Sequence, residues 1–140
     1  MPHNNTTTFD IAACRARLRA QQAHQHHTRE QQRLAVLRRL RDAAQSVFCC
    51  FPDIQRVYLF GSVLRPGALR VTSDIDIAVE GRLTAEDYFA LWGALEGLVG
   101  YRPIDLVDLG RELHFADRVR DQGLLLYEHS DSDPESRSCR

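Results

Sequence analysis

The chain has no lysine, because all 18 of its basic residues are arginines. That absence excludes chemistry at a lysine amine, such as formation of a Schiff base. Long apolar runs are missing as well. No run approaches the ~20 residues of a membrane span, and the polar N-terminus lacks the apolar stretch of a signal peptide. We therefore expect a cytoplasmic protein with no membrane partner.

Cysteine is sparse and shows no metal-binding or redox pattern. Cys14, Cys49, Cys50 and Cys139 form no C-x-x-C pair, and the adjacent Cys49 and Cys50 are poorly placed to bond each other. We predict reduced and mostly structural thiols. A chain of 140 residues is most simply one domain with a single core.

The formal charge is −1 overall but is unevenly spread. Residues 10–45 carry eight arginines against three acids, whereas the rest of the chain carries ten arginines against sixteen acids. A basic segment on an acidic body indicates either a surface for an acidic partner, RNA or protein, or a solvated helix face. The charge pattern leaves both interpretations open.

Composition divides the chain into four segments. We expect residues 1–8 to be disordered, 9–50 to form an N-terminal helical segment, 51–128 to form the folded core and 129–140 to be a disordered tail. The helical segment contains no Gly or Pro from Asp10 to Phe48, but its middle, "QQAHQHHTREQQ", has no apolar face. We predict two helices, or one long helix whose middle packs on nothing in the monomer. The second half should cover the core, while the first half projects or forms a dimer.

The core alternates strand and helix patterns. Strands are predicted at "RVYLFG" (56–61), "DIDIAVE" (74–80) and "IDLVDL" (104–109), with a last short strand at "LLLYE" (124–128). A helix should follow Thr84, with Phe89, Trp92 and Leu95 in the core, and another should end at Gly123. This order predicts an α/β (α+β) fold with a small mixed β-sheet flanked by helices.

Two aspartates interrupt an apolar strand in "SDIDIAVE". Residues i and i+2 share a face of a strand, so Asp74 and Asp76 project together while Ile75 and Ile77 face the core. If the strand at 104–109 pairs beside them, Asp105 joins the same face. Three carboxylates within ~4 Å would repel one another by about 4 kcal/mol per pair, so a proton or a divalent cation must neutralise them. Oxygen ligands with open positions suit Mg²⁺.

Gly61 and Ser62 end the preceding strand and can supply the other half of a phosphate site. Glycine lets the backbone approach a ligand closely, and exposed N–H groups and a serine hydroxyl can bind phosphate. The pattern Gly-Ser, a loop, Asp-x-Asp and a later Asp resembles the minimal nucleotidyltransferases (MNT domains) of the polymerase-beta-like superfamily. The residues that carry the resemblance are Gly61, Ser62, Asp74, Asp76 and Asp105.

Weaker matches and one departure lie in the loop of this motif. Arg65 matches an arginine common in the family, Gly67 the loop glycine, and Ser73 the residue before the first aspartate. Eleven residues, rather than the family's ten, separate Ser62 from Asp74, and Pro66 has the character of an insertion. The resemblance covers roughly residues 53–128.

The resemblance implies a nucleotidyltransferase with two Mg²⁺ ions and ATP as substrate. Asp74 and Asp76 would hold the nucleotide-binding ion, and Asp105 would share the second ion next to the attacking hydroxyl. Gly61, Ser62, Arg65 and Ser73 would contact the nucleotide. For Arg65 and for Arg70, contact with phosphate and a solvated loop position are equally open. Three residues of the helical middle could ligate a metal: His24, His27 and Glu30. A solvated, His-rich helix face is the commoner explanation for such a pattern.

Stand-alone proteins of this kind resemble the antitoxins of HEPN–MNT toxin–antitoxin modules. That implies transfer of AMP from ATP to a tyrosine of a HEPN ribonuclease toxin, with a protein partner and no direct nucleic-acid binding. Two alternatives stay open: an antitoxin that blocks its toxin by contact through the arginine-rich helix, and a nucleotidyltransferase acting on a small molecule across a homo-oligomer.

Overall fold

The structure, a computed structural model, describes residues 10–130 and combines one mixed sheet with three α-helices. The elements are α1 (Ile11–Phe48), β1 (Ile54–Phe60), the 3₁₀ helix η1 (Gly61–Leu64), β2 (Ile75–Gly81), α2 (Ala85–Leu98), β3 (Ile104–Asp108), α3 (Leu113–Gln122) and β4 (Leu124–Glu128). The strand order is β3-β2-β1-β4, with β2 and β3 parallel and the other neighbours antiparallel. The predicted fold class is therefore confirmed.

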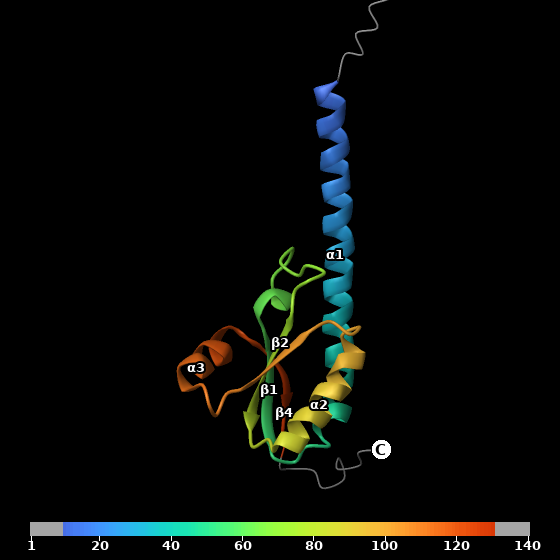
Figure 1. Ribbon diagram of the computed structural model, residues 1–140. Helices are drawn as coiled ribbons and strands as arrows, with labels where there is room; N and C mark the ends of the chain where they lie inside the picture. The colour runs from blue at the N-terminus through green and yellow to red at the C-terminus, as the bar shows by residue number, and fades with distance from the viewer. Residues whose placement is uncertain (1–9, 131–140) are drawn as a thin grey trace, which may run out of the picture.

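Two layers of helix cover the two faces of the sheet. Ile75, Ile77 and Val79 of β2 point into the main core, which α1 and α2 close from one side (Figure 1). Tyr58 and Ala78 point the other way and pack under α3. The two-residue alternation along β1 and β2 thus sends apolar side chains to both faces.

α1 is one continuous helix, which is the second of the two arrangements predicted from the sequence. Its 38 residues span about 57 Å at 1.5 Å per residue. Val36, Leu40, Ala44 and Phe48 are buried, so the second half covers the core as expected. Through residues 10–27 every residue but Cys14 is exposed, and this half stands clear of the sheet (Figure 1).

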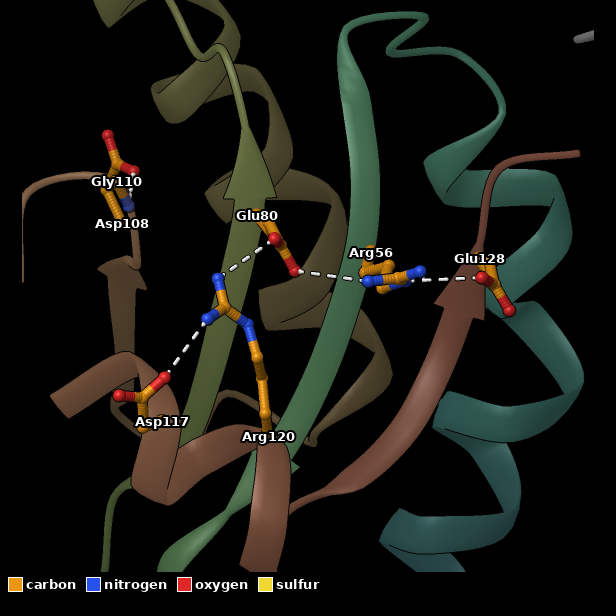
Figure 2. A network of polar contacts seen from close by, with 7 residues as sticks. All are labelled: Arg56, Glu80, Asp108, Gly110, Asp117, Arg120 and Glu128. Carbon is orange, nitrogen blue, oxygen red and sulfur yellow. Dashed lines mark hydrogen bonds and ion pairs between the residues drawn. The ribbon is translucent and has the colours of Figure 1, made fainter. Parts of the chain in front are cut away.

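α3 is held on its face of the sheet by ion pairs as well as by apolar contacts. Arg120 donates to Glu80 of β2 at 3.0 Å and contacts Asp117 at 3.4 Å. Arg56 of β1 bridges Glu80 and Glu128, at 3.9 and 3.2 Å. Figure 2 shows this chain of charges crossing from α3 over three strands. Exposed pairs of this kind contribute about 0–1 kcal/mol each, so the network aligns α3 more than it stabilises the fold.

Some expectations of the sequence are corrected or stay untested. Phe89 is 65% exposed, so its placement in the core was wrong, while Leu95 is fully buried as predicted. Residues 1–8 and most of 129–140, expected to be disordered, lie outside the described residues, and the boundaries of the 9–50 and 51–128 segments stay predictions. Between residues 10 and 130, no helix is both long and apolar enough to cross a membrane.

The projecting half of α1 should be dispensable for folding. A chain that begins at Gln25 keeps every buried residue of α1, so we expect its melting temperature to stay within about 3 °C of that of the full chain. Thermal unfolding followed by circular dichroism would measure this. A fall well beyond that value would show that the first half of α1 is packed in solution, for example against a second copy.

Candidate active site

The two strands that carry the aspartates lie side by side. β2 and β3 are parallel, and Asp76 and Asp105 occupy paired positions in their register. Ile75, Ile77 and Leu106 are buried in the main core, so the two aspartates project from the other face. Asp74 directly precedes β2 and is exposed. The predicted pairing of the strands is thus present, and Asp108, set aside as a strand-end residue, accepts the N–H of Gly110 instead.

Asp76 lies against the backbone of Gly61. In the antiparallel pairing of β1 with β2, Phe60 is opposite Asp76, so the chain turns into η1 directly over that carboxylate. Gly61 has φ +77°, which favours glycine, and a Cβ there would lie 2.1 Å from Asp76 Oδ2. Only glycine allows this approach, which brings the Gly-Ser corner and the Asp76 carboxylate into one site.

The carboxylates influence one another electrostatically. Burial, and after it the charges of Asp105 and Asp74, together raise the pKa of Asp76 to about 6. A cation bound at these carboxylates would favour the ionised form of Asp76 and so oppose this rise in its pKa. This is the electrostatic signature of the site.

The donor set fits a magnesium ion that shares its coordination with a nucleotide. Within residues 10–130, no group of three or more His, Cys, Asp or Glu side chains is placed to hold a metal by itself. Mg²⁺ commonly takes only one or two carboxylates from a protein and fills its other positions with water and substrate phosphates. Asp76 and Asp105, at paired positions of β2 and β3, supply carboxylates of that type and number, and Asp74 is the exposed residue directly before β2.

The two serines at the ends of this loop, Ser62 and Ser73, make different contacts. The carbonyl of Ser62 accepts the N–H of Arg65, while its hydroxyl has no recorded partner among the described residues. Ser73 closes the loop, because its hydroxyl accepts the N–H of Arg70 at 2.9 Å and its own N–H donates to the Arg70 carbonyl. Ser73 therefore shapes the loop, and any contact it makes with a nucleotide would be additional.

α1 holds this loop through a pair of charges that the sequence did not reveal. Arg33, 7% exposed, donates to both carboxylate oxygens of Glu30 and, at 3.2 Å, to the carbonyl of Val63 at the end of η1. Glu30 in turn accepts the N–H of Gly67. Hydrogen bonds from Arg33 and Gly67 hold the pKa of Glu30 below its usual range. The loop leans toward α1 accordingly (Figure 1).

This contact corrects two readings of the helical middle. The segment was expected to pack on nothing, yet it contacts the loop at Glu30, and a Cβ on Gly67 would meet His26 Cε1 at 3.0 Å. Glu30 is committed to Arg33 and Gly67, which removes it from the metal site considered with His24 and His27. Arg102 fastens the same loop from the α2–β3 turn, donating to the Arg70 carbonyl at 2.8 Å. Pro66, which the sequence suggested as an insertion, therefore lies in a loop that is tied down on both sides.

A family model described as "Polymerase beta, Nucleotidyltransferase" matches residues 43–132. The chain belongs to this nucleotidyltransferase family. The match starts in the second half of α1 and includes every strand, so it contains Gly61, the carboxylates and the loop between them. The resemblance drawn from the Gly-Ser and Asp-x-Asp motifs is thereby confirmed.

Solved structures with a similar fold come from toxin–antitoxin pairs. A mutant form of the MntA–HepT toxin–antitoxin pair aligns at 26% identity and a TM-score of 0.53, over 70% of this chain and 80% of that one. A toxin–antitoxin structure with AMP-PNP aligns at 29% and 0.48, over 75% and 80%. A tri-AMPylated Shewanella oneidensis HEPN toxin in complex with its MNT antitoxin aligns at 26% and 0.49, over 73% and 80%. No curated protein sequence matches significantly.

Removing the charge of Asp76 should stabilise the metal-free nucleotidyltransferase. A carboxyl whose pKa is raised on folding opposes folding above its unfolded pKa near ~4, and the cost is complete above pH ~6. Because Asp76 is only partly buried, solvent screening leaves about 1 kcal/mol of this cost. With EDTA present, Asp76→Asn should therefore melt higher than the parent at about pH 8, and the gain should shrink as the pH falls from ~6 toward ~4. The exposed Asp117→Asn is the control, and a gain independent of pH would contradict the electrostatic origin.

Loss of Glu30 should loosen the loop. Glu30→Ala leaves the buried guanidinium of Arg33 without its counterion and the N–H of Gly67 without an acceptor, so we expect a lower melting temperature and faster hydrogen exchange at Gly67. Adding Arg33→Met should restore much of the stability, because an apolar side chain needs no counterion. Asp42→Ala, an exposed acid on the same helix, is the matched control. Unchanged exchange at Gly67 would show that the loop is held by other contacts.

Proposed function

We propose that this nucleotidyltransferase is the antitoxin of a HEPN–MNT pair and transfers AMP from ATP to a tyrosine of its toxin. The observation that carries the chemistry is the contact of the Asp76 carboxylate with Gly61, beside Asp105. The partner assignment is supported by the similarity to the MntA–HepT structure with a TM-score of 0.53. That similarity covers most of the folded chain.

The residues divide the work between nucleotide and acceptor. Gly61 lets the phosphates approach the backbone, and the free hydroxyl of Ser62 can donate to them. Asp74 and Asp76 would hold a nucleotide-bound Mg²⁺, and Asp105 would share a second one. When bound, these ions would neutralise charge on the phosphates and lower the pKa of the attacking hydroxyl.

Transfer forms a bond between the acceptor oxygen and the α-phosphorus and breaks the bond from that phosphorus to the bridging oxygen. Pyrophosphate leaves with the electron pair of the broken bond, and AMP stays on the acceptor. A tyrosine, with an ordinary pKa near ~10, ionises more readily than an aliphatic hydroxyl. Asp105 is exposed and can pass the phenol's proton on to water.

A cavity gives the acceptor room to reach Asp105. It has a volume of about 450 Å³, and Asp105 lines it together with Tyr88, Phe89 and Arg111. It lies beside β3, one of the two edge strands of the sheet. The exposed ring of Phe89 offers a surface on which an aromatic acceptor can pack.

Labelled ATP tests this function directly. With Mg²⁺ and the HEPN protein whose toxicity the chain neutralises, label should appear on that protein, and Asp74→Ala with Asp76→Ala should reduce the rate by more than about 100-fold. Asp117→Ala, an exposed acid outside the site, should leave the rate unchanged. Mass spectrometry should place AMP on a tyrosine. Label found only on a small molecule would reject a protein acceptor.

The exposed arginines of α1 favour one second candidate, inhibition of the toxin by contact alone. Arg15, Arg17 and Arg19 lie on the projecting half of the helix, where nothing in the described chain covers them. The two functions separate in the same variants. Neutralisation that survives Asp74→Ala with Asp76→Ala but fails when these three arginines become glutamates would establish occlusion in place of transfer.

A further inference from the structure

A second cavity is lined in part by Gly61. It too has a volume of about 450 Å³, and it lies between η1 and the C-terminal part of α3. Gly61 lines it, and Gly61 is also the residue that touches the Asp76 carboxylate. Gly61 is thus shared by the cavity and the carboxylate site.

The cavity is basic. Its lining contains Arg65 from the end of η1, Arg118 from α3 and no acidic residue. Arg33, Arg56 and Arg120 each bind a carboxylate. The guanidinium groups of Arg65 and Arg118 make no hydrogen bond or ion pair with another residue between 10 and 130. Two guanidinium groups thus border one cavity without a counterion from the chain described.

The backbone beneath Arg118 is firmly placed. Ala116 and Val119, on either side of it in α3, are 1% and 2% exposed and pack on the sheet. Phe115 contacts Phe60 edge-on, with ring centroids 5.2 Å apart. At the end of α3, a Cβ on Gly123 would lie 2.5 Å from the Val119 carbonyl and 3.0 Å from that of Leu59, so the helix end abuts β1 just before Gly61. The fold therefore fixes the Cα of Arg118 beside the Gly-Ser corner.

We propose that Arg118 binds the β- and γ-phosphates of the nucleoside triphosphate, opposite Arg65. The inference rests on the proposed function, since it places the nucleotide at Gly61 and the carboxylates. Gly61 borders both the Asp76 carboxylate and a cavity with two arginines, and this arrangement of charges matches a metal-bound α-phosphate followed by an anionic tail. Arginine suits that tail because its planar fork binds phosphate oxygens in pairs. The same contact would stabilise the pyrophosphate as it leaves.

A nucleobase is the other part of the nucleotide that this cavity could take. It would use the apolar floor formed by Leu64, Phe115 and Val119, with Gln122 for hydrogen bonds. The absence of any acid among the lining residues, together with two arginines that lack counterions, favours the phosphates. The two cases differ in what they predict for AMP, which has the base but no β- or γ-phosphate.

Affinities of the full chain for three ligands test the proposal. Isothermal titration calorimetry would give Kd for MgATP, and competition would give Kd for AMP and for magnesium tripolyphosphate. Arg118→Gln should weaken MgATP and tripolyphosphate by about tenfold or more and change AMP by less than about twofold. Arg118→Lys should recover part of the loss. Arg120→Gln, on the same helix but paired with Glu80, is the control and should bind like the parent.

Several results would overturn the assignment. Equal losses for ATP and AMP would place the base or ribose at Arg118, and no loss for any ligand would remove it from the site. The melting temperature of Arg118→Gln should stay close to that of the parent, because Arg118 is exposed.

Failure of the Arg118 assignment can be distinguished from failure of the proposed function. If the parent binds MgATP with the Arg118 dependence described but labels no protein, the antitoxin transferase proposal fails alone. If it transfers AMP while Arg118→Gln leaves KM for ATP unchanged, the phosphate assignment fails alone.

Discussion

A carboxylate packed against a glycine Cα is the contact on which the site depends. Antiparallel pairing of β1 with β2 puts Phe60 opposite Asp76, and the chain then turns at Gly61 over the carboxylate. The Gly-Ser corner and the aspartate come from segments separated by a long loop, yet strand register alone brings them together. Parallel pairing of β2 with β3 adds Asp105 by the same means. Strands fix such positions better than loops do, because neighbouring residues hold each one on both sides.

The site is electrostatically unfavourable without a ligand, and the core is what holds it in place. Ile75 and Ile77, each fully buried, flank Asp76 and bind β2 to the main core, so the aspartate cannot move away from Asp105 and Gly61. The raised pKa of Asp76 reflects this unfavourable environment for its negative charge. A bound cation would relieve it. Apolar packing on one face of the sheet thus supports binding chemistry on the other.

Periodic features of the fold could be read from the sequence, whereas contacts between distant polar side chains could not. Alternation along β2 correctly assigned Ile75 and Ile77 to the core, and the parity of Asp105 placed it with Asp76. The bond from Arg33 to Val63 joins residues 30 apart and leaves no periodic trace. Arg118 escaped notice for the same reason, since only the packing of α3 brings it near Gly61. The prediction that Phe89 is in the core failed because helix spacing does not show how far the sheet extends beneath the helix.

At the loop between η1 and β2, Arg33 makes contacts for which arginine is suited and lysine is not. Arg33 uses its Nε and both terminal nitrogens at once, two on Glu30 and one on the Val63 carbonyl. A lysine ammonium is a compact point charge and could not span these two partners from a buried position. Because Glu30 also accepts the N–H of Gly67, this guanidinium orders both the end of η1 and the loop that leads to Asp74. The helix that projects into solvent therefore also supports the loop before Asp74, and it does so through the planar guanidinium of Arg33.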